Sequence, residues 1–309
     1  TINPFFSVVI PVHNRANLVT KAIESVLMQE CTDFELLVID DGSTDDIVGA
    51  LERFDDARLK LVQQPNGGAS QARNTGIDLA RGAYVALLDS DDVYLSHHLT
   101  AMKAILERMP EVVAYSPVIA QRGPGRSFIK PPRPIGEGED MATYLICDRG
   151  FVQTSGLCLP APTARAVRYR VDAKFGDDTD FAIRLQLAGC RFVMAESPGV
   201  IWSDDADHER LSDQRQPLRE LQWLDDLRPR IPERAYLGYR GWHVAKSVFH
   251  ESAITALGLF FKAVLHGAYA PRLAAVIFLQ IVLTNSQYRR LTNYWLSRRR
   301  PTENANEAS

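Results

Sequence analysis

Short apolar runs alternate with helical patterns through the first hundred residues of this 309-residue chain. The runs cover residues 7–10, 34–39, 59–62 and 84–88. Between the first two, Leu18, Ala22 and Val26 recur every four residues, which predicts a helix with one apolar face. Residues 69–80 predict a helix whose small-residue face suits close packing on a sheet. This alternation predicts βαβ units and a mainly parallel sheet, and the handedness of crossovers favours one open α/β sheet flanked by helices.

The pattern loosens after about residue 117. Residues 121–139 are rich in Pro, Gly and Arg, which predicts a long loop. A strand over 151–159, a helix over 178–187 and a strand over 192–195 are expected next, and the pattern is helical from about residue 209. The domains expected are therefore residues 1–210 with halves 1–117 and 118–210, a C-terminal helical region over 211–300, and a disordered tail over 301–309.

Composition narrows the class of protein. Hydrophobic residues make up 46% and charged residues 24%, which is ordinary for a globular protein in water. A net charge of −3 argues against a nucleic-acid binder, whose domain is usually basic. The four cysteines include no CxxC pair, which favours reduced thiols in a cytoplasmic protein. Residues 1–6 show no features of a signal peptide.

Polar clusters follow three of the predicted strands: residues 13–15 (HNR), 40–41 (DD) and 89–92 (DSDD). In an open α/β sheet, ligands bind outside the carboxyl ends of the strands. Three carboxylates within residues 89–92 repel one another, and a divalent cation would relieve that repulsion. Carboxylate oxygens suit Mg²⁺ or Mn²⁺, often together with substrate phosphates. The alternative is a solvated acidic turn that caps the next helix.

Four ordered segments resemble the motifs of the family 2 glycosyltransferases, the large inverting family with the GT-A fold. They are residues 8–15 (VVIPVHNR), 35–45 (ELLVIDDGSTD), 66–68 (NGG) with 72–76 (ARNTG), and 87–92 (LLDSDD). The resemblance covers roughly residues 5–210. It implies a GT-A fold and the metal-dependent transfer of a sugar from a nucleotide-diphosphate donor, most often a UDP-sugar. The acceptor would be a hydroxyl of a glycan or a lipid-linked molecule, as in bacterial surface glycan or glycolipid assembly.

The resemblance also implies roles for individual residues. Those expected to bind the nucleotide-sugar are Pro11, Val12 and Asn14 at the base and ribose, Asp41 at the base edge, Arg73 and Asn74 in the Ala-Arg-Asn signature, and Asp89 with Ser90 near the sugar or ribose. Asp91 matches the carboxylate of the D-x-D element that holds the cation against the diphosphate. Without the resemblance, Arg73 would be read as a surface charge on a helix and Asp41 as a helix N-cap in the turn of Thr44.

The second half is expected to supply a catalytic base. Members of the family commonly carry Glu-Asp-x-Asp at the start of a helix, and here residues 177–180 read DDTD. Asp178 falls on the base position, and Asp177 replaces the usual Glu. A helix N-terminus there favours an ionised carboxylate, although capping alone would also explain the acids. His208 matches a histidine that some relatives use on the metal or diphosphate, or it is a plain surface histidine.

The C-terminal region carries the most apolar stretch, residues 253–283. Its longest uninterrupted run, 273–279, is far short of the roughly 20 residues that a membrane span needs. Arginines interleaved with aromatic residues follow over 288–300. Two hypotheses remain open: peripheral contact with the inner face of a membrane, or packing and homo-oligomer formation through the C-terminal helices.

Two other functions share part of this pattern. A nucleotidyltransferase also has an open α/β sheet and metal-binding acids, but it usually has a Gly-rich basic loop after the first strand, where residues 12–15 read VHNR. A non-catalytic sugar-nucleotide-binding subunit is the second alternative, and the acids present at all three strand ends argue against it.

Overall fold

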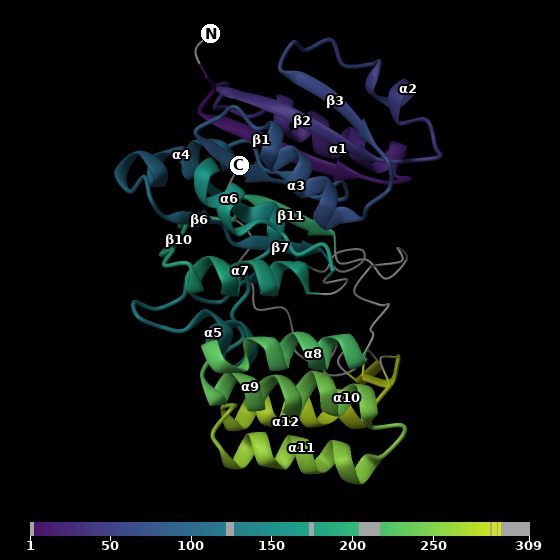
Figure 1. Cartoon of the computed structure of the whole chain (residues 1–309), viewed down its shortest axis with the longest axis vertical. Helices are drawn as coiled ribbons and strands as arrows, with labels where there is room; N and C mark the ends of the chain where they lie inside the picture. Colours follow the sequence, from purple (N-terminus) through teal and green to yellow (C-terminus); the bar gives the residue numbers. More distant parts are fainter. Residues whose placement is uncertain are drawn as a thin grey trace, which may run out of the picture. The chain divides into compact units, whose positions relative to one another are not determined.

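The computed structural model of the chain describes residues 3–121, 127–172, 176–203, 217–284, 286–288 and 290–291. The chain forms two compact units, residues 1–223 and residues 224–309. Figure 1 shows strands and helices in the first and helices in the second.

The first unit is built on a seven-stranded sheet (Figure 1). In spatial order its strands are β10 (Phe192–Met194), β6 (Val113–Tyr115), β9 (Leu157–Pro160), β4 (Tyr84–Leu87), β1 (Phe6–Val12), β2 (Phe34–Asp41) and β3 (Leu59–Gln64). Only β9 runs antiparallel to its neighbours β4 and β6, and the other pairs are parallel. The predicted open, mainly parallel α/β sheet is therefore confirmed.

The centre of this sheet is apolar because both of its faces are covered. Every residue of β1 and β2 is buried, and Val9 lies opposite Leu37 in their parallel register. The helices of this unit are α1 (Ala16–Leu27), α2 (Ile47–Leu51), α3 (Ala69–Leu79), α4 (His98–Arg108), α5 (Met141–Cys147), α6 (Ala161–Val167) and α7 (Asp177–Leu187).

The small-residue face of α3 allows this helix to lie directly on β1. A Cβ atom added at Gly76 would lie 2.2 Å from Cγ1 of Val9, a distance that no side chain could occupy. Close contact between α3 and the strand therefore requires glycine at this position, and it brings residues 73 and 74 near the carboxyl end of the sheet.

A second, four-stranded sheet corrects the prediction of a long loop over 121–139. Its order is β5 (Val93–Tyr94), β11 (Val200–Ser203), β7 (Val118–Gln121) and β8 (Ser127–Lys130). The strand β8 pairs antiparallel with β7 and forms the edge of this sheet, with Phe128 and Ile129 exposed. None of the four residues of β8 is buried, so the strand has no alternation of apolar and polar residues that would predict it. The surrounding Pro and Gly residues predicted a loop instead.

The strand expected over 151–159 is also shorter than predicted. Residues Thr154–Gly156 form a 3₁₀ turn, and β9 begins only at Leu157. The turn directs Ser155 toward Asp92, to which its hydroxyl donates a hydrogen bond of 2.6 Å.

Helices make up the described part of the second unit, as predicted. The helix α8 (Pro217–Leu227) begins within the first unit, and α9 (Glu233–Tyr239), α10 (Ala245–Val248), α11 (Ala253–Leu265) and α12 (Pro271–Val282) follow it. A π-helical turn over Arg240–Val244 joins α9 to α10. Gly241 lets α11 approach this turn, because a Cβ there would lie 2.4 Å from that of Ala263. Across the described ranges, every helix falls short of the length and apolarity needed to cross a bilayer.

A buried carboxylate, Glu35 on β2, ties three strands to the start of β4. Ser7 Oγ donates to it at 2.7 Å, Lys60 Nζ at 2.9 Å, and the Arg81 backbone N–H at 2.8 Å. Burial alone would raise its pKa, but the hydrogen bonds from Lys60, Arg81 and Ser7 outweigh that effect and lower the pKa of Glu35 to about 2.

We expect Glu35→Gln to lower the free energy of unfolding by about 2 kcal/mol at pH 7. Because the folded pKa lies below the ordinary value near 4.5, this stabilisation is present above pH 5 and is lost as the pH falls toward 2. Urea unfolding between pH 7 and 2.5 should therefore show a flatter profile for the variant. Glu107→Gln, at a side chain 58% exposed, serves as the control. A variant profile as steep as that of the unmodified protein would contradict this role.

Candidate active site

Arg73 on α3 is buried between two carboxylates that lie far apart in the sequence. Its Nη2 lies 2.7 Å from Asp89 Oδ1, just beyond β4, and its Nη1 lies 3.2 Å from Asp177 Oδ2, in the first turn of α7. Its guanidinium also lies 5.0 Å from the centre of the Tyr169 ring. Arg73 is therefore not a surface charge: it joins α3, the end of β4 and the start of α7 around one point.

Asp178 lies beside this ion-pair cluster and accepts a hydrogen bond from Thr154 Oγ1. Because the Thr154 hydroxyl donates to Asp178, the Tyr169 hydroxyl must be the donor in its 2.9 Å contact with Thr154. Burial and, after it, the charge of Asp89 together raise the pKa of Asp178 to about 6, against the opposing effects of Arg73 and Thr154. The stabilisation of the ionised form expected from the helix N-terminus is thus outweighed by the desolvation of the carboxylate.

We expect Thr154→Val to raise the pKa of Asp178 above about 6, because the ionised carboxylate loses a hydrogen-bond donor. A ¹³C NMR titration of the aspartate carboxyls measures this pKa, and Asp178→Asn identifies the resonance. Thr154→Ser keeps the hydroxyl and should titrate as the unmodified protein does. An unchanged or lower pKa in the valine variant would show that this hydrogen bond does not stabilise the ionised form.

The three carboxylates of residues 89–92 each have their own partners rather than a common one. Asp89 pairs with Arg73, and Asp91 pairs with Arg15 at 2.8 Å. Asp92 is buried and accepts hydrogen bonds from Ser155 Oγ and Gln153 Nε2, both at 2.6 Å. Burial raises the pKa of Asp92 well above its usual range, and the neighbouring charges of Asp89 and Asp91 add to the effect.

The partners of these three carboxylates determine which of them could bind the predicted cation. In the part of the chain that the structure describes, no three His, Cys, Asp or Glu side chains gather in a way that could hold a metal ion. The Asp91 side chain remains 25% exposed, so its oxygens can be reached from solvent. The adjacent Ser90 is buried. His208 lies outside the described residues.

The loops after β1, β2 and β3 are tied together at the same end of the sheet. Asn14, in a left-handed conformation (φ 53°), accepts hydrogen bonds from the backbone N–H and the hydroxyl of Thr44 at 2.7 and 3.1 Å. Its own backbone N–H donates to Ser43 Oγ at 2.9 Å. Pro11 and Val12 are buried at the end of β1. The predicted base-and-ribose residues of β1 therefore adjoin the loop that follows Asp41.

Asp41 holds the start of α3. Its carboxylate accepts hydrogen bonds from the backbone N–H groups of Gly67 and Gly68 at 2.9 and 2.7 Å and from Gln64 Nε2 at 2.7 Å. The carboxylate therefore holds the turn before α3 and is not the helix cap considered as the alternative, because Asp46 caps the helix that follows Thr44. About four acceptor positions exist on a carboxylate, so these three bonds leave one unused by the bonds named here.

Asn74 fixes the backbone of Tyr169 beside the candidate site. It is 1% exposed, its Nδ2 donates to the Tyr169 carbonyl, and its Oδ1 accepts from the Tyr169 N–H, both at 2.8 Å. Tyr169 is the residue whose ring faces Arg73 and whose hydroxyl contacts Thr154. Asn74 thus positions this tyrosine, and both polar atoms of its amide form hydrogen bonds with the Tyr169 backbone.

Sequence reasoning did not assign several of these residues. Thr154 and Tyr169 lie in stretches without a motif, so no signal in the sequence indicated them. Arg15 stands within the first motif and follows a strand, as the acids of residues 89–92 do, so its expected place at the same end of the sheet was a usable signal. Asp180, next to the predicted base, is buried and accepts a hydrogen bond from Trp223 Nε1 at 2.8 Å, so it anchors α8 instead.

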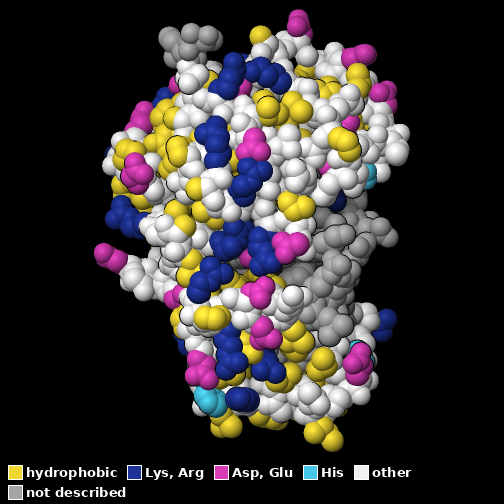
Figure 2. Space-filling view, viewed as in Figure 1, with side chains coloured by type: hydrophobic (Ala, Val, Ile, Leu, Met, Phe, Trp, Pro, Cys, Tyr) yellow, Lys and Arg dark blue, Asp and Glu magenta, His cyan; other side chains and the backbone are white. Residues whose placement is uncertain are grey.

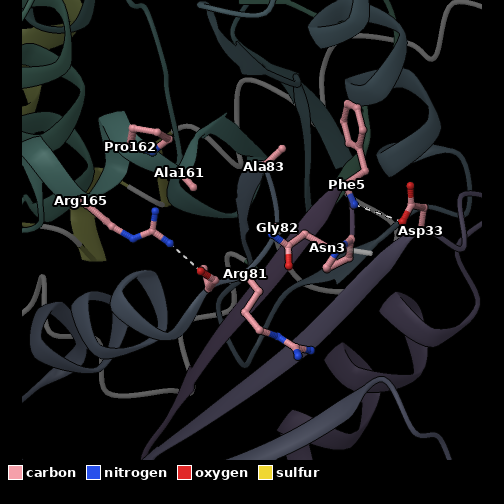
Figure 3. Close-up of a pocket in the computed structure, with 11 residues that line it drawn as sticks. Asn3, Phe5, Asp33, Arg81, Gly82, Ala83, Ala161, Pro162 and Arg165 are labelled. Atoms are coloured by element: carbon pink, nitrogen blue, oxygen red, sulfur yellow. Dashed lines mark hydrogen bonds between the residues drawn. The ribbon is translucent and has the colours of Figure 1, made fainter. Parts of the chain in front are cut away.

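A separate pocket of about 670 Å³ opens at the other end of the strands (Figure 3). Phe5, Asp33 and Ala83, which line it, come just before β1, β2 and β4. Figure 3 shows Arg165 reaching toward a backbone carbonyl, that of Ala80, and the Arg81 side chain directed away from it. No residue predicted to bind substrate lines this pocket.

Two comparisons with known proteins decide the family of this chain. The model of the family "Glycosyl transferase family 2" matches residues 7–155. The amylovoran biosynthesis glycosyltransferase AmsB of Erwinia amylovora is 31% identical over 255 residues, which cover 77% of this chain and 82% of AmsB. This chain belongs to glycosyl transferase family 2.

Two further comparisons show how much of the chain resembles other proteins in sequence and in fold. The glycosyltransferase GlyG of Streptococcus pneumoniae is 34% identical over 116 residues, 36% of this chain and 38% of GlyG. The crystal structure of S. aureus TarS 1-349 in complex with UDP-GlcNAc superposes with a TM-score of 0.63 at 19% identity, covering 94% of this chain and 91% of that one. At this identity the superposition informs only about the fold. It confirms the predicted GT-A architecture.

Proposed function

We propose that this glycosyltransferase moves a sugar from a nucleotide-diphosphate donor, a UDP-sugar, to an acceptor hydroxyl with inversion at the anomeric carbon. The observation that supports this proposal best is the position of Asp178. Its carboxylate lies beside Asp89 and Arg73 at the carboxyl end of the sheet, and its pKa is raised to about 6. A base with a pKa near neutrality is mostly ionised at pH 7 and still accepts a proton readily.

In the proposed reaction, Asp178 takes the proton of the acceptor hydroxyl as its oxygen attacks the anomeric carbon. The departing nucleoside diphosphate leaves from the opposite face, which inverts the configuration. Thr154 holds the Asp178 carboxylate in place through its hydrogen bond, and Tyr169 supports Thr154. Arg73 keeps Asp89 and Asp177 oriented around the same point. These residues thus position a base whose protonation state suits the transfer.

Asp91 is the residue that we propose to hold a divalent cation, Mn²⁺ or Mg²⁺. Its oxygens are partly exposed hard donors, and Arg15, its ion-pair partner, is itself 30% exposed and can be displaced. One or two carboxylates together with substrate phosphates form a usual magnesium site. When bound there, the cation would supply positive charge for the leaving diphosphate. His208 remains a second predicted ligand.

For the nucleotide, we propose the loops after β1, β2 and β3. Pro11, Val12 and Asn14 would lie along the base and ribose, and Asp41 has one acceptor position left for the base edge. Ser90 and Asp89 would lie near the sugar. The choice of UDP is supported by TarS, whose structure was solved with UDP-GlcNAc.

The acceptor that we propose is a glycan or lipid-linked molecule of surface polysaccharide assembly. The relative AmsB is described as an enzyme of amylovoran biosynthesis, which supports a polysaccharide product. A lipid-linked acceptor would place the reaction in the cytoplasm at the inner face of the membrane, with the protein as a peripheral component. Self-association through the C-terminal helices remains a prediction.

Asp178→Asn should reduce transfer by about 10²–10⁴-fold, since the variant cannot accept the proton, and should leave nucleotide binding nearly intact. Transfer is measured with a panel of radiolabelled nucleotide-sugars and a soluble acceptor, and UDP binding by calorimetry with Mn²⁺. Asp172→Asn, at a side chain 71% exposed, is the matched control. Transfer by the Asp178 variant at the unmodified rate would refute the assignment of the base.

Measurements of released pyrophosphate and released UDP separate the alternative functions. Release of pyrophosphate from a nucleoside triphosphate would indicate a nucleotidyltransferase, against which the family match already argues. A non-catalytic sugar-nucleotide-binding subunit would bind UDP-sugar but release no UDP in the presence of metal and acceptor.

Removal of the Arg15 charge should strengthen cation binding when no nucleotide is present, because Arg15 then no longer competes for Asp91. We expect Arg15→Ala to lower the Kd for Mn²⁺ about two- to fivefold, measured by the EPR signal of free Mn²⁺. Arg53→Ala, at a side chain 59% exposed, should leave it unchanged. Asp91→Asn should abolish the binding, and if it does not, the cation lies elsewhere. An Arg15→Ala variant with unchanged affinity for Mn²⁺ would show that Arg15 does not compete for Asp91. It would not bear on Asp91 as the ligand of the cation.

A further inference from the structure

The helix α11 exposes an apolar stripe in the second unit. Ile254, Phe261 and Leu265 are 88%, 52% and 83% exposed, and they recur with Gly258 at helical spacing along one face. A Cβ added at Gly258 would meet nothing within 4 Å, so this face opens to solvent. Figure 2, drawn from the same side as Figure 1, shows hydrophobic side chains protruding where α11 lies. Several large apolar side chains exposed together on one helix face indicate an interaction surface.

The charge of the chain is divided unevenly between its two units. Residues 224–309 contain 12 Lys and Arg against 6 Asp and Glu, whereas residues 1–223 contain 23 against 32. On α11 and α12 the charged residues are Lys262 and Arg272, both exposed, and neither helix contains an acid. A basic unit on an acidic chain favours an anionic partner for the face beside the stripe.

The size and shape of the stripe favour a bilayer over a protein. A stable protein interface buries roughly 800 Å² on each side, whereas this stripe has three large side chains on a convex helix and is interrupted by glycine. A 13-residue helix, about 20 Å long, can lie in the plane of a membrane and insert apolar side chains at the boundary of the acyl chains. Lys262 would then extend its charge to the headgroups.

We propose that α11 docks on the surface of an anionic lipid bilayer. Ile254, Phe261 and Leu265 insert below the headgroups, and Lys262 and Arg272 contact lipid phosphates. This inference moves the expected membrane contact from residues 288–300, most of which lie outside the described residues, to a helix with defined exposure. It does not depend on which donor or acceptor the enzyme uses.

The test is co-sedimentation of the full chain with vesicles of phosphatidylcholine alone or mixed equally with phosphatidylglycerol. We expect binding to the mixed vesicles that weakens in high salt, and a decrease of about tenfold or more in the partition coefficient for the double variant Phe261→Ser with Leu265→Ser. The matched control is Met28→Ser, an equally simple change at a side chain 76% exposed in the first unit, and it should bind as the unmodified chain does.

Two results would overturn the proposal: mixed vesicles that fail to bind the unmodified chain, or a double variant that binds them fully. A dimer by light scattering that becomes a monomer in the double variant, without vesicle binding, would assign the stripe to a second copy instead. Circular dichroism and the thermal midpoint of the double variant confirm that it is folded. Transfer to a soluble acceptor should be unchanged in the double variant, so a failure of docking is distinguishable from a failure of the proposed reaction.

Discussion

The ion pairs of one buried arginine are the interaction on which the carboxyl end of the sheet depends. Arg73 places a guanidinium between Asp89 and Asp177, which come from the end of β4 and the start of α7. Without that charge, the carboxylates gathered there would repel one another in a poorly solvated setting. Its contact with the Tyr169 ring connects the same point to the residue that supports Thr154 and, through it, Asp178.

The two arginines at this end of the sheet differ in exposure, and that difference separates their roles. Arg73 is buried and bonds to two carboxylates, so it is a permanent part of the framework. Arg15 and Asp91 are both partly exposed, so their pair can open without leaving a buried charge uncompensated. In the proposed reaction, Asp91 is therefore the acid that can change partners, while Asp89 and Asp177 stay oriented.

The second unit has a different physical character from the first. The first is acidic and has its apolar core in the strands and the helices that cover them, while the second is basic and leaves an apolar stripe on α11 exposed. Within that unit, close approaches such as Gly241 against Ala263 already satisfy the packing of the other side of α11. The exposed stripe is thus additional to what holds these helices together.

The sequence alone determined the open α/β sheet, the small-residue face of α3 and the end of the sheet where the acids gather, because periodicity and the residues that follow a strand are properties of contiguous segments. The pairing of β8 with β7 could not be predicted from the sequence, since a short edge strand without a buried face has no period to detect. Tertiary structure decided which acid meets which arginine: Arg73 and Asp177 lie 104 residues apart. It also decided that the pKa of Asp178 rises rather than falls, because desolvation depends on everything packed around a carboxylate and not on its place in a helix.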